Sequence, residues 1–264
     1  MSLEGTGAEE ARPRLFEPAI SRRVIALTWA KAVGLLALAR AAAAFEPTGL
    51  LLRNLAAVAA LLFILLPENL FRRRGERWGD YGLPWWGAAD ARTWRAWGRG
   101  TLFGLGVCAL AFPAFGLSFW GFADLLARLP SGAARLLGPY STSPRLEPAL
   151  PRGFALLALT QVLAVALPEE MFYRGFVQTA FARLGPTRVR VLGAELGHGF
   201  FATQILFALG HLVSLEPWRV ATFLPGLLFG WARERTGNLA APVVIHALSN
   251  LFLAFLETSL LSAR

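Results

Sequence analysis

Apolar segments alternate with short polar ones along this chain, and most of the apolar segments are long enough to cross a membrane as helices. A helix needs about 20 residues for this. Spans are predicted over residues 24–45, 50–66, 101–122, 153–184, 200–215, 220–233 and 239–256. The chain of 264 residues is 55% hydrophobic and only 16% charged, which is too apolar for an ordinary soluble domain. We therefore predict an all-α polytopic transmembrane helix bundle with about seven to eight membrane helices, forming one domain over residues 1–264.

Residues 78–100 differ from the spans, because tryptophans and arginines alternate in this segment. Such mixtures are typical of helices at the lipid headgroups, so we expect an interfacial amphipathic segment here; an embedded piece would be the eighth membrane helix. Residues 124–152 are too polar to span and are predicted to form an outer loop. Pro168 is expected to bend the fourth span.

Basic residues are concentrated in the segments on one side of the predicted spans, including Arg22, Arg23 and the cluster Arg72-Arg73-Arg74. By the positive-inside rule, residues 1–23 form a cytoplasmic tail and the carboxyl terminus lies outside. We expect a bacterial inner (cytoplasmic) membrane, since an Arg-, Ala- and Leu-rich chain with one lysine suggests a GC-rich genome. The net charge of +9 does not indicate a nucleic-acid partner, because the arginines form no stripe with aromatic residues.

Two adjacent carboxylates, Glu169 and Glu170, interrupt the fourth apolar segment. Charged groups in a membrane are costly and are usually retained for chemistry, for a cavity or for an ion pair. Glu170 precedes Arg174 by four residues, the favourable order for an ion pair on one helix face. Glu169 is rotated by about 100° from that face. The spacing favours an organising role for Glu170 and Arg174, and leaves Glu169 free as a general base.

The other candidates lie in later spans. His211 follows Phe207 by one helical turn, and the apolar ring of Phe207 is a candidate substrate contact. His246 and Asn250 are also four residues apart, so both can direct hydrogen-bond donors at a developing oxyanion. His198 is expected to be solvated or interfacial. One acid, two histidines and one amide are sufficient for hydrolysis of a peptide bond by an activated water.

These motifs, in this order on successive membrane helices, resemble the CPBP family of intramembrane endopeptidases, which includes type 2 CAAX prenyl proteases and bacteriocin-processing proteins. The resemblance covers residues 153–256 and implies a catalytic core there. It implies that Glu169 activates water with His211, while His246 and Asn250 stabilise the oxyanion. The substrate would be a membrane-anchored protein or peptide in the lipid bilayer, and a myxosortase-like sorting activity is one form of this function.

Alternatives to this interpretation concern the metal and the activity. No cofactor is favoured, because the His-Glu-x-x-His zinc helix is absent. If the enzyme is metal-dependent, Glu169, His211 and His246 would bind Zn²⁺. A proton-coupled membrane transporter would also use intramembrane acids and histidines. A non-catalytic membrane scaffold with the same fold is the third alternative.

Overall fold

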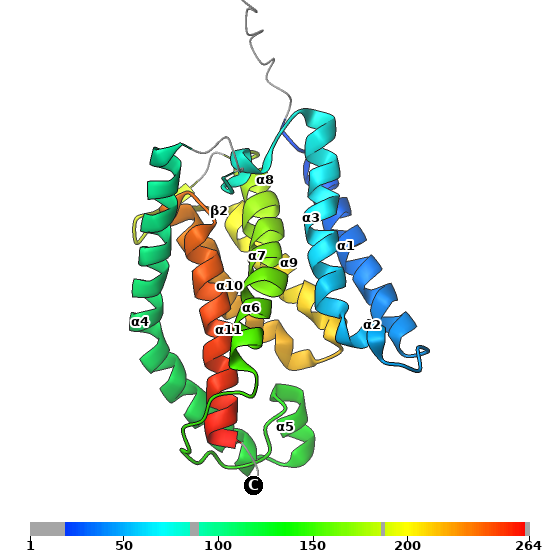
Figure 1. Cartoon of the computed structure of the whole chain (residues 1–264), viewed down its shortest axis with the longest axis vertical. Coiled ribbons are helices and arrows are strands. Elements are labelled where there is room, and N and C mark those ends of the chain that lie inside the picture. Colours follow the sequence, from blue (N-terminus) through cyan, green and yellow to red (C-terminus); the bar gives the residue numbers. More distant parts are fainter. Residues whose placement is uncertain (1–18, 85–89, 186–187, 262–264) are drawn as a thin grey trace, which may run out of the picture.

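The computed structural model describes residues 19–84, 90–185 and 188–261. Most of the long helices run along the long axis of the molecule (Figure 1). Five helical stretches among these residues are long and apolar enough to cross a membrane: Arg22–Ala43, Leu55–Arg74, Ala91–Arg128, Phe154–Ala182 and Ala240–Leu261. The prediction of an all-α polytopic bundle is confirmed, and the protein is an integral membrane protein.

The first two spans form a helical hairpin. Helix α1 (Arg22–Ala43) begins after Ser21, whose hydroxyl accepts a hydrogen bond from a backbone N–H of the first turn. Helix α3 (Leu55–Arg74) packs against α1, and the short α2 (Leu50–Arg53) lies in their connection. Leucines such as Leu38 and Leu61 are exposed on the outer faces of this pair, as expected for helices that contact lipid.

Helix α4 (Ala91–Arg128) is longer than the predicted third span. Its 38 residues extend about 57 Å, whereas the hydrocarbon core is about 30 Å thick. The first turns of α4 contain the arginines and two tryptophans of the expected interfacial segment, so this part is not a separate helix. Trp85 and Trp86 lie outside the described residues. Asp90 caps α4 by accepting hydrogen bonds from the Thr93 N–H and hydroxyl, which lowers the pKa of its carboxyl group.

The fourth span is one continuous helical stretch whose geometry changes along its length. It consists of α6 (Phe154–Thr160), the π-helical η2 (Gln161–Ala166), α7 (Leu167–Glu170), the π-helical η3 (Met171–Gln178) and α8 (Thr179–Ala182). Pro168 lacks the N–H that an α-helical turn requires, and widened π turns lie on both sides of it. The glutamate pair therefore lies between two π segments, which are frequent at functional sites.

Three helices complete the bundle. Helices α9 (His198–His211) and α10 (Phe223–Thr236) have 14 residues each, about 21 Å, and pack against each other and the fourth span. The last helix, α11 (Ala240–Leu261), packs along α4. The connection between α9 and α10 contains η4 (Leu212–Ser214) and η5 (Pro217–Thr222), and α5 (Ser131–Leu137) lies in the predicted outer loop.

A small antiparallel hairpin precedes α9 and is absent from the sequence-based prediction. It pairs β1 (Arg188–Val191) with β2 (Ala194–Gly197). Leu192 and Gly193 form its two-residue turn, and both have positive φ angles. His198 directly follows the hairpin and is exposed, in agreement with its predicted position.

The loop after α3 ties several helices together at the end of the bundle where α1 begins. Tyr81, in η1 (Trp78–Tyr81), donates a hydrogen bond to Glu76 and accepts one of 3.1 Å from Arg183. Arg233 of α10 donates to the Tyr81 carbonyl at 3.3 Å. Burial and the Glu76 contact raise the pKa of the Tyr81 hydroxyl. This loop fixes the ends of the helices that carry the candidate site.

Candidate active site

The two adjacent glutamates have different surroundings. Glu170 is fully buried, and every residue of η3, which follows it, is buried as well. The Glu169 side chain keeps 18% of its surface exposed and lines a cleft. The Glu169 carboxylate is therefore accessible from outside the core, and the Glu170 carboxylate is enclosed within it.

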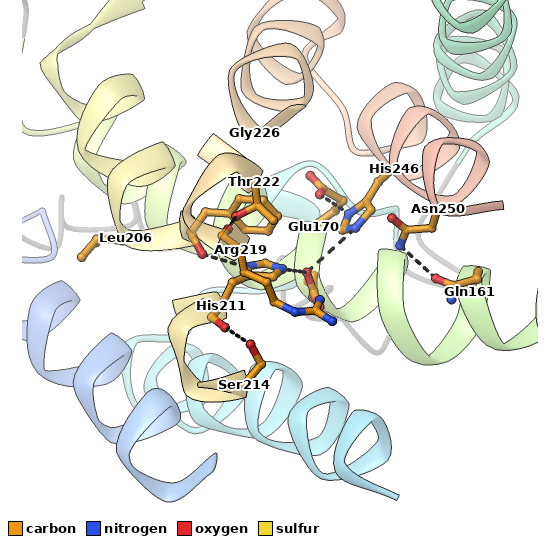
Figure 2. A network of polar contacts seen from close by, with 12 residues as sticks. Gln161, Glu170, Leu206, His211, Ser214, Arg219, Thr222, Gly226, His246 and Asn250 are labelled. Atoms are coloured by element: carbon orange, nitrogen blue, oxygen red, sulfur yellow. Dashed lines mark hydrogen bonds and ion pairs between the residues drawn. The ribbon is translucent and has the colours of Figure 1, made fainter. Parts of the chain in front are cut away.

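Glu170 joins the fourth span to the last helix. Its Oε1 atom accepts a hydrogen bond of 2.9 Å from Arg174 Nη1, as the helical spacing predicts. The same oxygen lies 2.7 Å from Nδ1 of His246, in α11 (Figure 2). An ionised carboxylate can only accept, so Nδ1 donates in this contact. Glu170 thus orients His246, a role that the sequence spacing did not predict, and leaves Nε2 of the ring directed toward Glu169.

Arg174 is completely buried and has partners on several sides. Its Nη2 atom donates to Gln204 Oε1 at 2.8 Å and to the Gly226 carbonyl at 3.0 Å. The guanidinium carbon lies 4.3 Å from the centre of the Phe207 ring and 5.2 Å from that of Phe229. Hydrogen bonds and aromatic faces offset part of the cost of burying this cation.

The polar contacts continue from Arg174 toward the end of the bundle where α1 begins. Gln204 donates to Gln178 at 3.1 Å, and Gln178 donates to Glu234 Oε1 at 2.8 Å. Gln178 and Gln204 lie on different helices, so they form the interhelical hydrogen bonds expected of polar residues in membrane spans. These hydrogen bonds between side chains fix the positions of η3, α9 and α10 relative to one another.

Glu169 faces both histidines at the inner end of the cleft. Its Oε2 atom is 3.9 Å from Nε2 of His211 and 3.9 Å from Nε2 of His246. Both distances are too long for hydrogen bonds, and Oε2 is buried without a hydrogen-bond partner among the described residues. His211 Nδ1 donates to the Phe207 carbonyl at 2.8 Å, so a neutral ring has an unprotonated Nε2. The carboxylate and this nitrogen are both acceptors, and a water molecule has the two donors needed to join them.

Asn250 lies one turn beyond His246 on α11, as predicted. One N–H of its amide donates to Gln161 Oε1 at 2.9 Å. Gln161 is the first residue of η2, and sequence reasoning did not identify it, although a polar residue in an apolar run is a recognisable signal. The second N–H of the Asn250 amide stays available for another acceptor.

The structure corrects the expectation for Phe207. Its side chain is only 1% exposed, and it is not among the residues that line the cleft. The ring packs edge-on against His211, with 4.5 Å between ring centres, and covers the Arg174 guanidinium. Phe207 therefore packs against His211 and Arg174 within the core, and its ring does not line the cleft.

The cleft beside Glu169 has a volume of about 200 Å³. Its apolar wall comes from α1 and α3, which lie outside the region of the sequence resemblance. Tyr173 and Gly210 extend the wall around Glu169. Two other lining residues, Arg40 and Arg219, are cations. The residues from α1, α3, η4 and η5 are Leu36, Arg40, Leu55, Ala56, Ala59, Phe63, Val213, Ser214 and Arg219.

Glu169, His211 and His246 are also the side chains that a zinc ion would use. Zinc bonds of about 2.0–2.2 Å place neighbouring tetrahedral donors roughly 3.3–3.5 Å apart. The carboxylate oxygen is 3.9 Å from each imidazole nitrogen. Within the described part of the chain, no group of three or more histidine, cysteine, aspartate or glutamate side chains is arranged to hold a metal ion. The two measured separations exceed the spacing expected of zinc ligands by about 0.4–0.6 Å.

Comparison with known proteins identifies the carboxyl-terminal part of the chain. The family described as type II CAAX prenyl endopeptidase Rce1-like matches residues 151–252. No curated protein and no solved structure matches the chain. The matched residues include both glutamates, Arg174, both site histidines and Asn250. Helices α1 and α3, which form the apolar wall of the cleft, lie outside the matched range. Residues 151–252 are thus similar to the type II CAAX prenyl endopeptidase Rce1-like family, which supports the resemblance of this part of the chain to the CPBP family.

Proposed function

We propose that this protein is an intramembrane endopeptidase that cuts a membrane-associated protein or peptide near its terminus, with Glu169 as the general base. One observation carries the proposal: a Glu169 oxygen without a hydrogen-bond partner among the described residues faces Nε2 of both histidines at 3.9 Å, at the inner end of an apolar cleft. A carboxylate that lines such a cleft beside two histidines is the default candidate for catalysis.

Water activation follows from the two acceptors at this point. A water molecule that enters from the cleft donates one hydrogen to Glu169 and the other to His211 Nε2. Glu169 takes the first proton as the water oxygen attacks the substrate carbonyl, and later gives it to the leaving amine. The Phe207 carbonyl keeps His211 in the tautomer that this step requires. The proposed reaction needs no metal.

The oxyanion of the tetrahedral intermediate is stabilised by His246 and Asn250. Because Nδ1 of His246 is committed to Glu170, Nε2 donates only when the ring holds two protons. The second amide N–H of Asn250 is the other donor.

The position of the cleft bears on the type of substrate. With the amino terminus in the cytoplasm, the end of α1 that carries Arg40 lies at the outer side of the membrane. A cleft in the outer half favours the tail of an exported protein, as in myxosortase-like sorting, or a peptide precursor. Prenylated tails are made in the cytoplasm and would lie on the opposite side.

The membrane proteome of the host tests this function directly. Cells that lack the protein are compared with cells that produce either the wild type or Glu169→Ala. We expect uncut carboxyl-terminal tails to accumulate both in the deletion strain and in the Glu169→Ala strain, because neither can activate water. Normal processing by a stably produced Glu169→Ala protein would overturn the assignment of Glu169.

A further inference from the structure

Two arginines lie in the wall of the cleft, and neither has a role in the proposed hydrolysis. Arg40 belongs to the last turn of α1, and Arg219 belongs to η5. The two residues are far apart in the sequence, and Arg40 lies outside the segment that matches the family. Figure 2 shows Arg219 near His211, and both residues line the cleft.

Arg40 is a half-buried cation without a hydrogen bond or ion pair to any described residue. An arginine in a membrane span is costly and normally finds a partner within the bundle or at the headgroups. A position near the end of α1 would allow the side chain to reach the lipid headgroups. Its place in the wall that contains Glu169 and His211 favours a partner inside the cleft instead.

Arg219 retains donors for a ligand. Its Nε atom donates to the carboxylate of Glu216, and no described residue accepts from its two Nη atoms. A guanidinium group binds carboxylates through parallel N–H donors, and its charge does not depend on pH in the physiological range. Arg219 can therefore bind a second carboxylate while its contact with Glu216 persists.

We infer that Arg40 and Arg219 form an anion subsite that binds a carboxylate of the substrate, while Glu169 acts on the peptide bond. This inference rests on the proposed function and adds the group by which the substrate is held. The rest of the wall is largely apolar, with Leu36, Leu55 and Phe63, so the residues next to the bound carboxylate are apolar as well. The carboxylate is either the free carboxyl terminus or an acidic side chain near the cleavage point.

Binding of three small probes tests the subsite without requiring cleavage. The probes are N-acetyl-leucyl-leucine with a free carboxylate, its carboxamide, and N-acetyl-aspartyl-leucinamide, in which only the side chain is acidic. They are titrated onto the full-length Glu169→Gln protein in nanodiscs of phosphatidylcholine. We expect at least fivefold tighter binding of a carboxylate probe than of the carboxamide, and the preferred carboxylate probe identifies the source of the anion.

Variants assign the preference to the two arginines. Arg40→Gln and Arg219→Gln are expected to abolish the preference for carboxylate, and Arg40→Lys to retain part of it. Arg53→Gln is the matched control, because Arg53 is an exposed arginine of the next helix and does not line the cleft. Equal binding of acid and amide, or an equal loss in Arg53→Gln, would overturn the subsite.

The lipid phosphate is the competing anion. The titrations are repeated in nanodiscs that contain phosphatidylglycerol. Arg40-dependent binding of this lipid, with no preference among the peptides, would show a headgroup site and overturn the proposal. A carboxylate preference in a protein that never cleaves a substrate would instead contradict the proposed function alone, so the two failures are distinguishable.

Discussion

At the scale of single residues, two neighbouring glutamates have different surroundings because successive residues of a helix point about 100° apart. Glu170 is enclosed with Arg174 and His246, whereas Glu169 faces the cleft. The i,i+4 spacing was enough to predict the ion pair of Glu170. It was not enough to predict the contact with His246, which is distant in the sequence and depends on how α11 packs against the fourth span.

The buried ion pair is expected to contribute far more to stability than an exposed pair of the same spacing. Glu170→Gln leaves the Arg174 charge uncompensated in the core, which should lower the free energy of unfolding by about 3–5 kcal/mol. The matched control is Asp124→Asn, because Asp124 pairs with Arg128 at 2.7 Å on an exposed helix face. Its expected loss is below about 1 kcal/mol. Denaturant unfolding in detergent measures both, and equal losses would contradict the enclosed ion pair.

At the scale of helices and strands, the hydropathy pattern located the five long apolar helices but not their true ends. It also predicted spans over residues 200–215 and 220–233, where α9 and α10 have only 14 residues each and are not among the five helices long enough to cross a membrane. It identified the apolar part of α4, whereas the helix continues through Arg92 and Arg95 into the polar region. Hydropathy reports which residues lie in lipid, and hydrogen bonding sets helix length. The hairpin at residues 188–197 was missed although Arg188 to Val191 alternate in polarity and Gly193 provides a turn, because a short exposed ribbon adds little apolar surface.

Helix α10 packs closely against the hydrogen-bonded amides of Gln178 and Gln204. A Cβ atom at Gly230 would lie 2.4 Å from Gln204 Nε2 and 2.8 Å from Gln178 Oε1. Gly230→Ala should therefore displace both amides and cost about 1–3 kcal/mol of stability. Gly106→Ala in α4 is the control, because a Cβ there meets nothing within 4 Å. Thermal unfolding in detergent compares the two, and a Gly230→Ala protein as stable as the control would contradict the packing.

At the scale of the whole molecule, the site depends on both halves of the chain. The residues that carry chemistry lie within residues 151–252, which match the family. The apolar wall of the cleft comes from α1 and α3, including Leu36 and Phe63. The motifs in the sequence indicated the candidate residues that the structure brings together, but they could not predict this wall, because apolar residues facing a cleft and those facing lipid have the same composition.

Cysteine labelling tests the predicted orientation of the molecule. In a Cys108→Ala background, which removes the one cysteine of the chain, a label that does not cross membranes is applied to intact spheroplasts. We expect Ser141→Cys to react from outside, because it is exposed in the outer loop. Arg73→Cys, exposed at the end of α3, should react only after the membrane is opened. The reverse pattern would place the amino terminus outside and the cleft in the inner half.

The central claim is that Glu169 activates the attacking water. The most direct measurement uses purified wild type, Glu169→Gln and Glu169→Asp proteins in liposomes, with a tail peptide identified by the proteome comparison and product detection by mass spectrometry. We predict a loss of at least about 100-fold in kcat for Glu169→Gln, partial activity for Glu169→Asp, and a midpoint of unfolding close to that of the wild type for both. Cleavage by Glu169→Gln at the wild-type rate would contradict the account.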